Sequence, residues 1–196
     1  MNTKKISITL AVFLFFSTIT TGIAGEHLLQ PKLGVADWSD DGTHSVKGNS
    51  FSLDSSHSTS LGFKYLYRLD NGFAFGGELF GYEKDYTHSN GRTGEADVGH
   101  VYGLAEYYFN NESSIKPYLG IGLGGAGIDF SGEINHVSSG KSSTIYAGIE
   151  FTINDRFAIS TEFKYFNIDI DEEHDNEKAD IKSNGTAAFI GFIIKI

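Results

Sequence analysis

The sequence predicts an all-β protein, an eight-stranded antiparallel up-and-down β-barrel that crosses a membrane. Its 196 residues include 24 glycines, 10 tyrosines and 16 phenylalanines but only 2 prolines, a composition that favours strands and turns. Apolar and polar residues alternate in eight segments, which is the period of a β-strand. The connections between these segments alternate between long and short, as they do in transmembrane barrels. Three short periplasmic turns and four long extracellular loops are therefore expected.

Residues 1–24 are predicted to be a secretory signal peptide. Lys4 and Lys5 supply the positive end, Ile6 to Phe16 is largely apolar, and Gly22-Ile23-Ala24 offers small residues for cleavage after Ala24. The apolar run is shorter than a membrane-spanning helix. We therefore expect an exported chain in which residues 25–196 form the barrel domain.

The strands follow one another in hairpins. The first is expected at Pro31 to Trp38, and the second runs from Thr59 to Leu69 before the turn at Asp70-Asn71-Gly72. If that turn centres on Asn71, Lys64 lies directly opposite Glu78 on the next strand. The remaining strands are expected, in order, around residues 73–80, 101–109, 115–123, 145–153, 157–165 and 186–196.

The connections complete this plan. Short turns are expected at 70–72, 110–114 and 154–156, and long loops at 39–58, 83–96, 131–143 and 169–182. One face of the strands is continuously apolar and aromatic, whereas the other carries ionisable residues. A soluble barrel has its apolar side inward, so this pattern favours a barrel in the outer membrane of a Gram-negative cell over a soluble periplasmic protein.

Four acids and four bases are predicted to point into the barrel. We expect them to form a closed network with lumen tyrosines that substitutes for a hydrophobic core, because an unpaired charge in a narrow lumen is costly. A narrow aqueous path lined by the same side chains is the alternative. The eight residues are Lys64, Arg68, Glu78, Glu106, Glu150, Glu162, Lys164 and Lys195.

Three segments carry a family resemblance: Ile115-Lys116-Pro117-Tyr118-Leu119-Gly120-Ile121-Gly122-Leu123-Gly124, Tyr146-Ala147-Gly148-Ile149-Glu150-Phe151 and Glu162-Phe163-Lys164-Tyr165. With the signal peptide, they resemble the OmpA-like, opacity-type porin family of eight-stranded outer-membrane barrels. The resemblance covers essentially the whole mature chain and implies a structural barrel, an adhesin, a serum-resistance protein or, in a few cases, a lipid-modifying enzyme. The chain departs from the family at Ile196, where such barrels commonly end in an aromatic residue.

The fourth long connection is strongly acidic. Carboxylates at this density are ligands that Ca²⁺ and Mg²⁺ prefer, but the spacing of an EF-hand is missing. We therefore expect a solvated loop, bridged to lipopolysaccharide by divalent ions, and neither a metal site nor a cofactor. Its acidic residues are Asp169, Asp171, Glu172, Glu173, Asp175, Glu177 and Asp180.

One pattern is typical of acyl-transfer catalysis. His136, Ser138 and Glu150 are similar to the His-x-Ser and later Glu of the outer-membrane lipid A 3-O-deacylase, but His136 and Ser138 fall in the third expected loop rather than on the penultimate strand. No catalytic residues and no enzymatic activity are therefore predicted. His44, His57, His88 and His100 are dispersed without the spacing of metal ligands and are expected at the surface.

Two main function classes follow from these residues. The first is a structural or surface-interaction barrel, adhesin-like, whose loops contact a host, phage or lipopolysaccharide ligand. The second is a narrow porin for small solutes, with a lipid-modifying enzyme third. The net charge of −10 argues against nucleic acid as a partner, and the absence of cysteine excludes disulfides. Membrane lipid and the barrel-assembly machinery are the expected partners, and a closed barrel without strand edges predicts a monomer.

Overall fold

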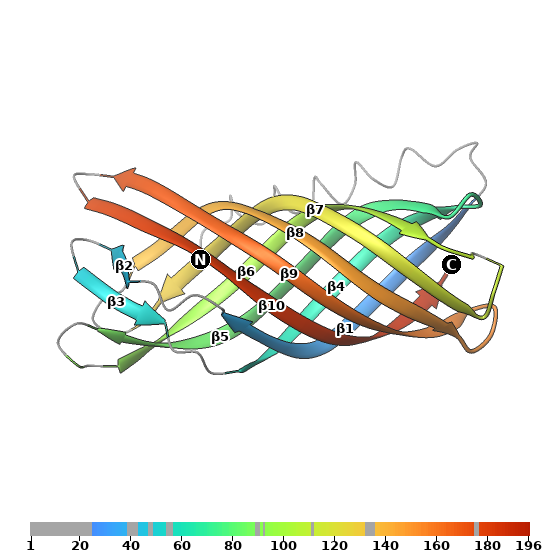
Figure 1. The fold of residues 1–196 in the computed structure, drawn as a ribbon, viewed down its shortest axis with the longest axis horizontal. Helices are drawn as coiled ribbons and strands as arrows, with labels where there is room; N and C mark the ends of the chain where they lie inside the picture. Colours follow the sequence, from blue (N-terminus) through green and yellow to red (C-terminus); the bar gives the residue numbers. More distant parts are fainter. Residues whose placement is uncertain are drawn as a thin grey trace.

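The computed structural model describes residues 25–38, 43–46, 49–53, 57–88, 91, 93–110, 112–131, 136–174 and 177–196. Eight antiparallel strands form the wall of a barrel, which closes where β1 pairs with β10 (Figure 1). The predicted eight-stranded barrel is thereby confirmed. The wall strands are β1 (Gly25–Trp38), β4 (Ser58–Leu69), β5 (Phe73–His88), β6 (Thr93–Tyr108), β7 (Ile115–Phe130), β8 (His136–Thr152), β9 (Phe157–His174) and β10 (Glu177–Lys195).

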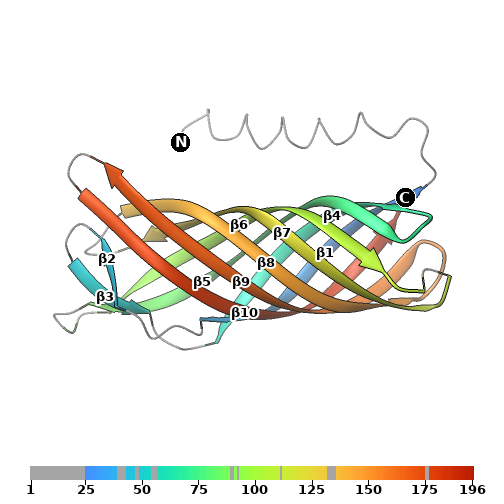
Figure 2. The same cartoon turned by 45° about the horizontal axis from the view of Figure 1, so that its top comes forward.

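The three predicted tight turns lie at one end of the barrel, together with the C-terminus (Figures 1 and 2). In the first of them, the Gly72 N–H donates to the Leu69 carbonyl at 3.0 Å, and Gly72 has a φ of 88°. Glycine reaches this left-handed conformation without steric cost. Short turns define the periplasmic end of an outer-membrane barrel, so the opposite end is extracellular. Among the described residues, no helix is long and apolar enough to cross a membrane.

The wall strands are longer than the sequence pattern predicted. β1 begins at Gly25 rather than Pro31, and at the extracellular end strands occupy most of the expected loops. Only residues 89–92 separate β5 from β6, residues 131–135 separate β7 from β8, and residues 175–176 separate β9 from β10. Three of the four long loops were therefore wrongly placed. The outward residues of these extensions are polar, as residues of a loop are, because a strand that continues beyond the bilayer needs no apolar outer face.

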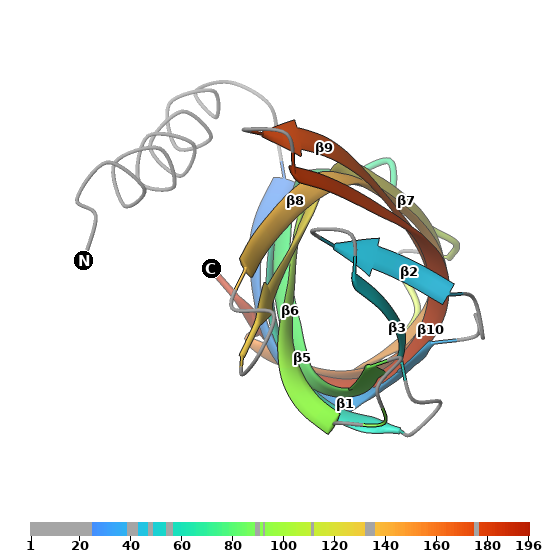
Figure 3. The ribbon, with the colours of Figure 1, turned by 90° about the vertical axis from the view of Figure 1, so that its left-hand side faces the viewer.

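The first long connection contains a small hairpin of its own, formed by β2 (Thr43–Val46) and β3 (Asn49–Leu53). β2 pairs with β10, where Val46 lies opposite Ala179, and β3 pairs with β5, where Phe51 lies opposite His88. The hairpin therefore takes the place of β1 and β4 in the wall beyond the points at which those strands end. Figure 3 views the barrel from this end and shows both strands at the mouth of the ring.

The two faces of the wall have the polarity that the alternation predicted. On β4, the outward side chain of Leu61 is 66% exposed, whereas the side chain of Lys64 is buried in the lumen. Large aromatic side chains gather on the outer surface near the tight turns, including Phe73, Tyr107 and Phe157. An exposed apolar surface with an aromatic girdle matches the outer surface of a transmembrane barrel.

Candidate functional site

The lumen holds a cluster of three lysines and three glutamates at mid-height. This central ionic cluster comes from five strands, and all of its side chains are inaccessible to solvent. Its members are Lys32 on β1, Lys64 on β4, Glu78 on β5, Glu106 on β6, and Glu162 and Lys164 on β9.

Glu162 is the centre of this cluster. Its carboxylate accepts from Lys32 Nζ at 2.9 Å, pairs with Lys64, and lies 3.6 Å from Lys164 Nζ. The other two glutamates of the cluster each form ion pairs with one or two of the same three lysines. Glu106 lies 2.7 Å from Lys64 Nζ, and Glu78 lies 2.7 Å from Lys164 Nζ and also pairs with Lys32. Every charge in the cluster therefore has an opposite charge beside it.

Two tyrosines complete the cluster from β7 and β8, the strands that lie between β6 and β9 in the wall. The Tyr118 hydroxyl donates to Glu162 at 3.1 Å, and the Tyr146 hydroxyl donates to Glu106 at 2.8 Å. The Tyr146 ring also lies 4.6 Å from Lys64 Nζ and 4.3 Å from Lys164 Nζ, within cation–π range. A Cβ at Gly148 would overlap the ring of Tyr118, so the absence of a side chain there makes room for this tyrosine.

A second set of charges lies closer to the periplasmic end. In this periplasmic ionic cluster, Arg68 Nη1 donates to Glu150 at 2.7 Å, and Arg68 Nε donates to Glu26 at 2.8 Å. Lys195 Nζ lies 2.8 Å from Glu150, and the Arg68 guanidinium is 4.5 Å from the centre of the Tyr108 ring. Each cation of this set again has a carboxylate partner.

An aromatic layer covers the central ionic cluster on its extracellular side. Phe80 stacks on His100 with ring centres 4.3 Å apart and meets Phe166 edge-on. It also meets Phe189, which lies at the level of the central ionic cluster with its ring 4.1 Å from Lys32 Nζ. The prediction that His100 lies at the surface is wrong, because it is 3% exposed in the lumen. Its inward position follows from the strand alternation, which places it on the same face as Tyr102.

The extracellular part of the lumen is packed with apolar side chains. An ionic network was expected to replace the hydrophobic core, but the structure combines the two: most of the buried charges occupy the periplasmic and central levels, the outer level holds the ion pair of buried Lys84 with Asp37 at 3.7 Å, and a hydrophobic cluster fills the rest of that level. Its fully buried members include Ile128, Phe130, Ile168, Ile170 and Ile181.

The structure places all eight predicted lumen charges inside the barrel and joins each of them to an opposite charge. They divide into the two clusters rather than forming one network. Sequence reasoning missed Lys32 and Glu26, because the first strand was started at Pro31 and its faces were not assigned. The alternation of Leu28, Gln30 and Lys32 was the signal that identifies Lys32 as inward.

The acidic segment forms strands rather than the expected loop. Asp169, Asp171, Glu172 and Glu173 belong to β9, and Glu177 and Asp180 belong to β10. Asp169 and Asp171 point outward and are exposed. Asp175 lies outside the described residues, as do the side chains of Glu172, Glu173, Glu177 and Asp180. Within the described side chains, no three histidines or carboxylates are grouped as metal ligands.

His136, Ser138 and Glu150 do not form a catalytic site. All three belong to β8, although His136 and Ser138 were expected in a loop, and Ser138 and Glu150 are twelve positions apart along this extended strand. This separation corresponds to roughly 40 Å at about 3.3 Å per residue. Glu150 is engaged with Arg68 and Lys195 in the periplasmic ionic cluster.

An eight-stranded barrel with an apolar, aromatic exterior and a charged interior defines a transmembrane β-barrel of the bacterial outer membrane. Residues 8–189 match the family described as outer membrane protein β-barrel domain, and the chain belongs to this family. No curated protein sequence matches the chain.

Similar solved structures support the same fold. Outer membrane protein OprG from Pseudomonas aeruginosa is 18% identical with a TM-score of 0.64, over 89% of this chain and 97% of that one. Neisserial surface protein A is 17% identical with a TM-score of 0.56, over 87% of this chain and 96% of that one. The attachment invasion locus protein Ail of Yersinia pestis, solved with the heparin analogue sucrose octasulfate, is 17% identical with a TM-score of 0.51, over 87% of this chain and 99% of that one.

Proposed function

We propose that this outer-membrane barrel is closed to solutes and acts as a structural and surface-interaction protein through its extracellular end. The observation that carries the proposal is which strands supply the buried side chains at mid-lumen. Every wall strand contributes a buried side chain at this level, so no sector of the cross-section depends on solvent to fill it. The contributing residues are Lys32, Lys64, Glu78, Glu106, Tyr118, Tyr146, Glu162 and Phe189.

The energetics of the central ionic cluster also favour a closed lumen. Opening a path requires separating buried charges such as Glu162 and its three lysines. Removing one partner of a buried ion pair costs about 3–5 kcal/mol. The aromatic layer around Phe80 adds a second barrier, because its rings are packed against one another. A passing solute would have to displace both layers.

The extracellular end supports the surface-interaction role. The wall strands continue beyond the apolar band, and the β2–β3 hairpin is hydrogen-bonded to β5 and β10 on its two sides. Such pairing holds surface residues on a stable framework, which is how binding surfaces are commonly presented. The β9–β10 hairpin is acidic, so we expect it to bind positively charged surfaces rather than sulfated polyanions of the kind present in the Ail complex.

Solute flux tests the closed lumen. The refolded protein is reconstituted into liposomes, and its folded state is verified by the change in gel mobility on boiling. We expect no uptake of small sugars or ions above that of empty liposomes, whereas a wide general porin gives rapid flux in the same assay. Flux through the folded protein, altered by Arg68→Ala or Glu78→Ala, would favour the narrow porin instead.

Surface binding tests the second part of the proposal. Cells that display the protein are incubated with polylysine-coated and heparin-coated beads. We expect retention of the polylysine beads only, and a large loss of retention when Asp169 and Asp171 are both replaced by Asn. Equal retention by cells without the protein would contradict the surface-interaction role.

As for its other partners, we propose that the chain is a monomer that is inserted by the barrel-assembly machinery.

A further inference from the structure

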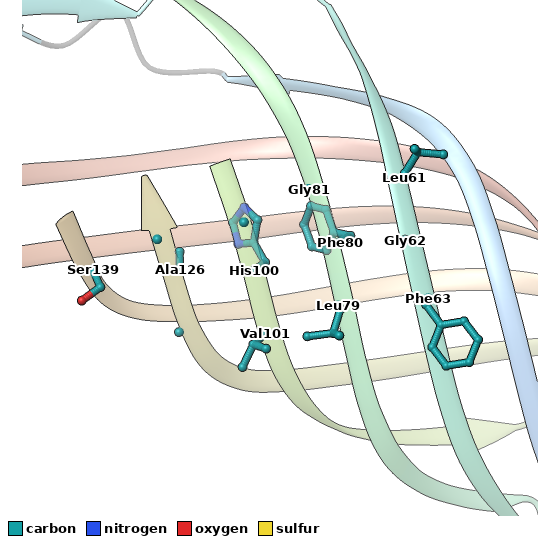
Figure 4. Close-up of a pocket in the computed structure, with 13 residues that line it drawn as sticks. Leu61, Gly62, Phe63, Leu79, Phe80, Gly81, His100, Val101, Ala126 and Ser139 are labelled. Carbon is teal, nitrogen blue, oxygen red and sulfur yellow. The ribbon is translucent and has the colours of Figure 1, made fainter. Parts of the chain in front are cut away.

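The lipid-facing wall carries an apolar groove of about 700 Å³ that crosses several strands (Figure 4). Its floor includes Gly81 on β5, Gly99 on β6 and Gly127 on β7, which lie directly opposite one another in the strand register. Ser139 on β8 continues this glycine row. Because no large side chain projects from the row, the outer surface is lower here than on either side.

Large apolar side chains border the groove on its periplasmic side. Leu79 and Val101 on that side are 41% and 50% exposed, whereas Leu61, which lies opposite Gly81 on β4, is 66% exposed and closes one end of the glycine row; Figure 4 shows all three along the strands that line the groove. The groove opens toward the bilayer, where acyl chains are the apolar groups present at high concentration. Its shape and lining therefore match an acyl chain that lies across the strands.

A row of carboxylates runs parallel to the groove on its extracellular side. Glu83, Asp97 and Asp129 lie opposite one another on β5, β6 and β7, two residues beyond the three glycines and on the same outward face. Like charges directly opposite on paired strands destabilise the sheet. The exposed positions of 81–87, 93–99 and 125–129 include no lysine or arginine. A cation from outside the barrel would remove this repulsion.

We propose that the groove and the carboxylate row together bind one membrane lipid whose headgroup carries an ammonium group. The acyl chain lies along the glycine row, and the ammonium contacts Asp97 and its neighbours. Two alternatives fit less well. Within the described residues no carboxylates are grouped as metal ligands, which disfavours an anionic lipid bridged by a metal ion. A second copy that met this face symmetrically would bring an identical carboxylate row against the first.

Filling the groove is possible without disturbing the barrel. A Cβ at Gly99 would have no neighbour within 4 Å, and a Cβ at Gly127 would meet only the Ser138 carbonyl oxygen at 3.8 Å. The double variant Gly99→Leu and Gly127→Leu therefore removes the groove while the wall is preserved. Gly103→Leu is the matched control, because its Cβ would meet only the Leu123 carbonyl oxygen at 3.8 Å and it lies outside the groove lining.

Native mass spectrometry of the folded protein measures which lipids it retains from nanodiscs that contain equal parts of phosphatidylethanolamine and phosphatidylglycerol and no other lipid with an ammonium headgroup. We expect a preference for phosphatidylethanolamine over phosphatidylglycerol of roughly fivefold, which corresponds to about 1 kcal/mol. The groove-filled variant is expected to lose bound lipid, and Gly103→Leu to keep it. Asp97→Asn combined with Asp129→Asn is expected to remove the preference but to leave lipid in the groove.

Two results would overturn this proposal. The first is equal retention of lipid by the groove-filled variant and Gly103→Leu. The second is retention of phosphatidylglycerol that requires Mg²⁺ and is lost with EDTA, because it would identify a metal-bridged anionic lipid. The change in gel mobility on boiling verifies that each variant is folded. The test concerns the outer wall only, so it is independent of whether the lumen conducts.

Discussion

Replacing Glu162 by Gln removes the charge at the centre of the lumen while almost preserving the volume of the side chain. The Glu162 carboxylate pairs with Lys32 and Lys64, lies 3.6 Å from Lys164 Nζ and accepts from Tyr118. In Glu162→Gln, three buried ammonium groups share only Glu78 and Glu106. Loss of one partner from a buried ion pair costs about 3–5 kcal/mol, a large part of the roughly 5–15 kcal/mol by which most domains are stable.

Urea unfolding of the reconstituted barrel measures this loss. Trp38 is the only tryptophan of the chain and is 2% exposed, so its fluorescence reports unfolding directly. Gel mobility before and after boiling provides a second probe. Glu112→Gln is the control, because this exposed carboxylate lies in the turn between β6 and β7, and we expect it to change stability by less than about 0.5 kcal/mol.

A double variant separates charge balance from packing. Lys64→Met in the Glu162→Gln background removes one of the unpaired ammonium groups, so we expect part of the lost stability to return. If Glu162→Gln unfolds at the same urea concentration as the parent, the reasoning that the central ionic cluster stabilises the barrel is refuted. If the double variant is less stable than Glu162→Gln, the loss comes from packing rather than from charge.

Three further predictions use the same folded-state assays. Glu78→Ala deprives Lys32 and Lys164 of a shared carboxylate, so we expect a loss of stability comparable to that of Glu162→Gln in urea titration; parental stability would contradict the network. Gly148→Leu places a side chain where the Tyr118 ring lies, so refolding yields measured by gel mobility should fall well below those of Gly103→Leu. Trp38 fluorescence should move to longer wavelength on unfolding, since its indole leaves a buried site; an unchanged emission maximum would contradict that burial.

The alternation of side chains along each strand determined most of the fold. A period of two residues assigns every side chain to one face, and tight turns fix the register of the following strand. The turn at Asn71 therefore predicted that Lys64 lies opposite Glu78, and the register of β4 and β5 confirms it. The same reasoning put eight charges into the lumen. It missed Lys32, which lay within the expected first strand, because the faces of that strand were not assigned.

Only the tertiary structure decided which charges meet and how far the strands extend. Lys64 contacts Glu106 and Glu162 through ion pairs, although Glu78 is its partner in the strand register. Pairing between adjacent strands is a local property, whereas contacts across a lumen depend on the tilt and stagger of all the strands around the closed barrel. Strand length beyond the membrane was equally missed. Outside the bilayer the outward residues of β9 and β10 are polar, as residues of a loop are, and only the closed barrel shows that Ile168, Ile170 and Ile181, which alternate with polar residues, pack together in the lumen.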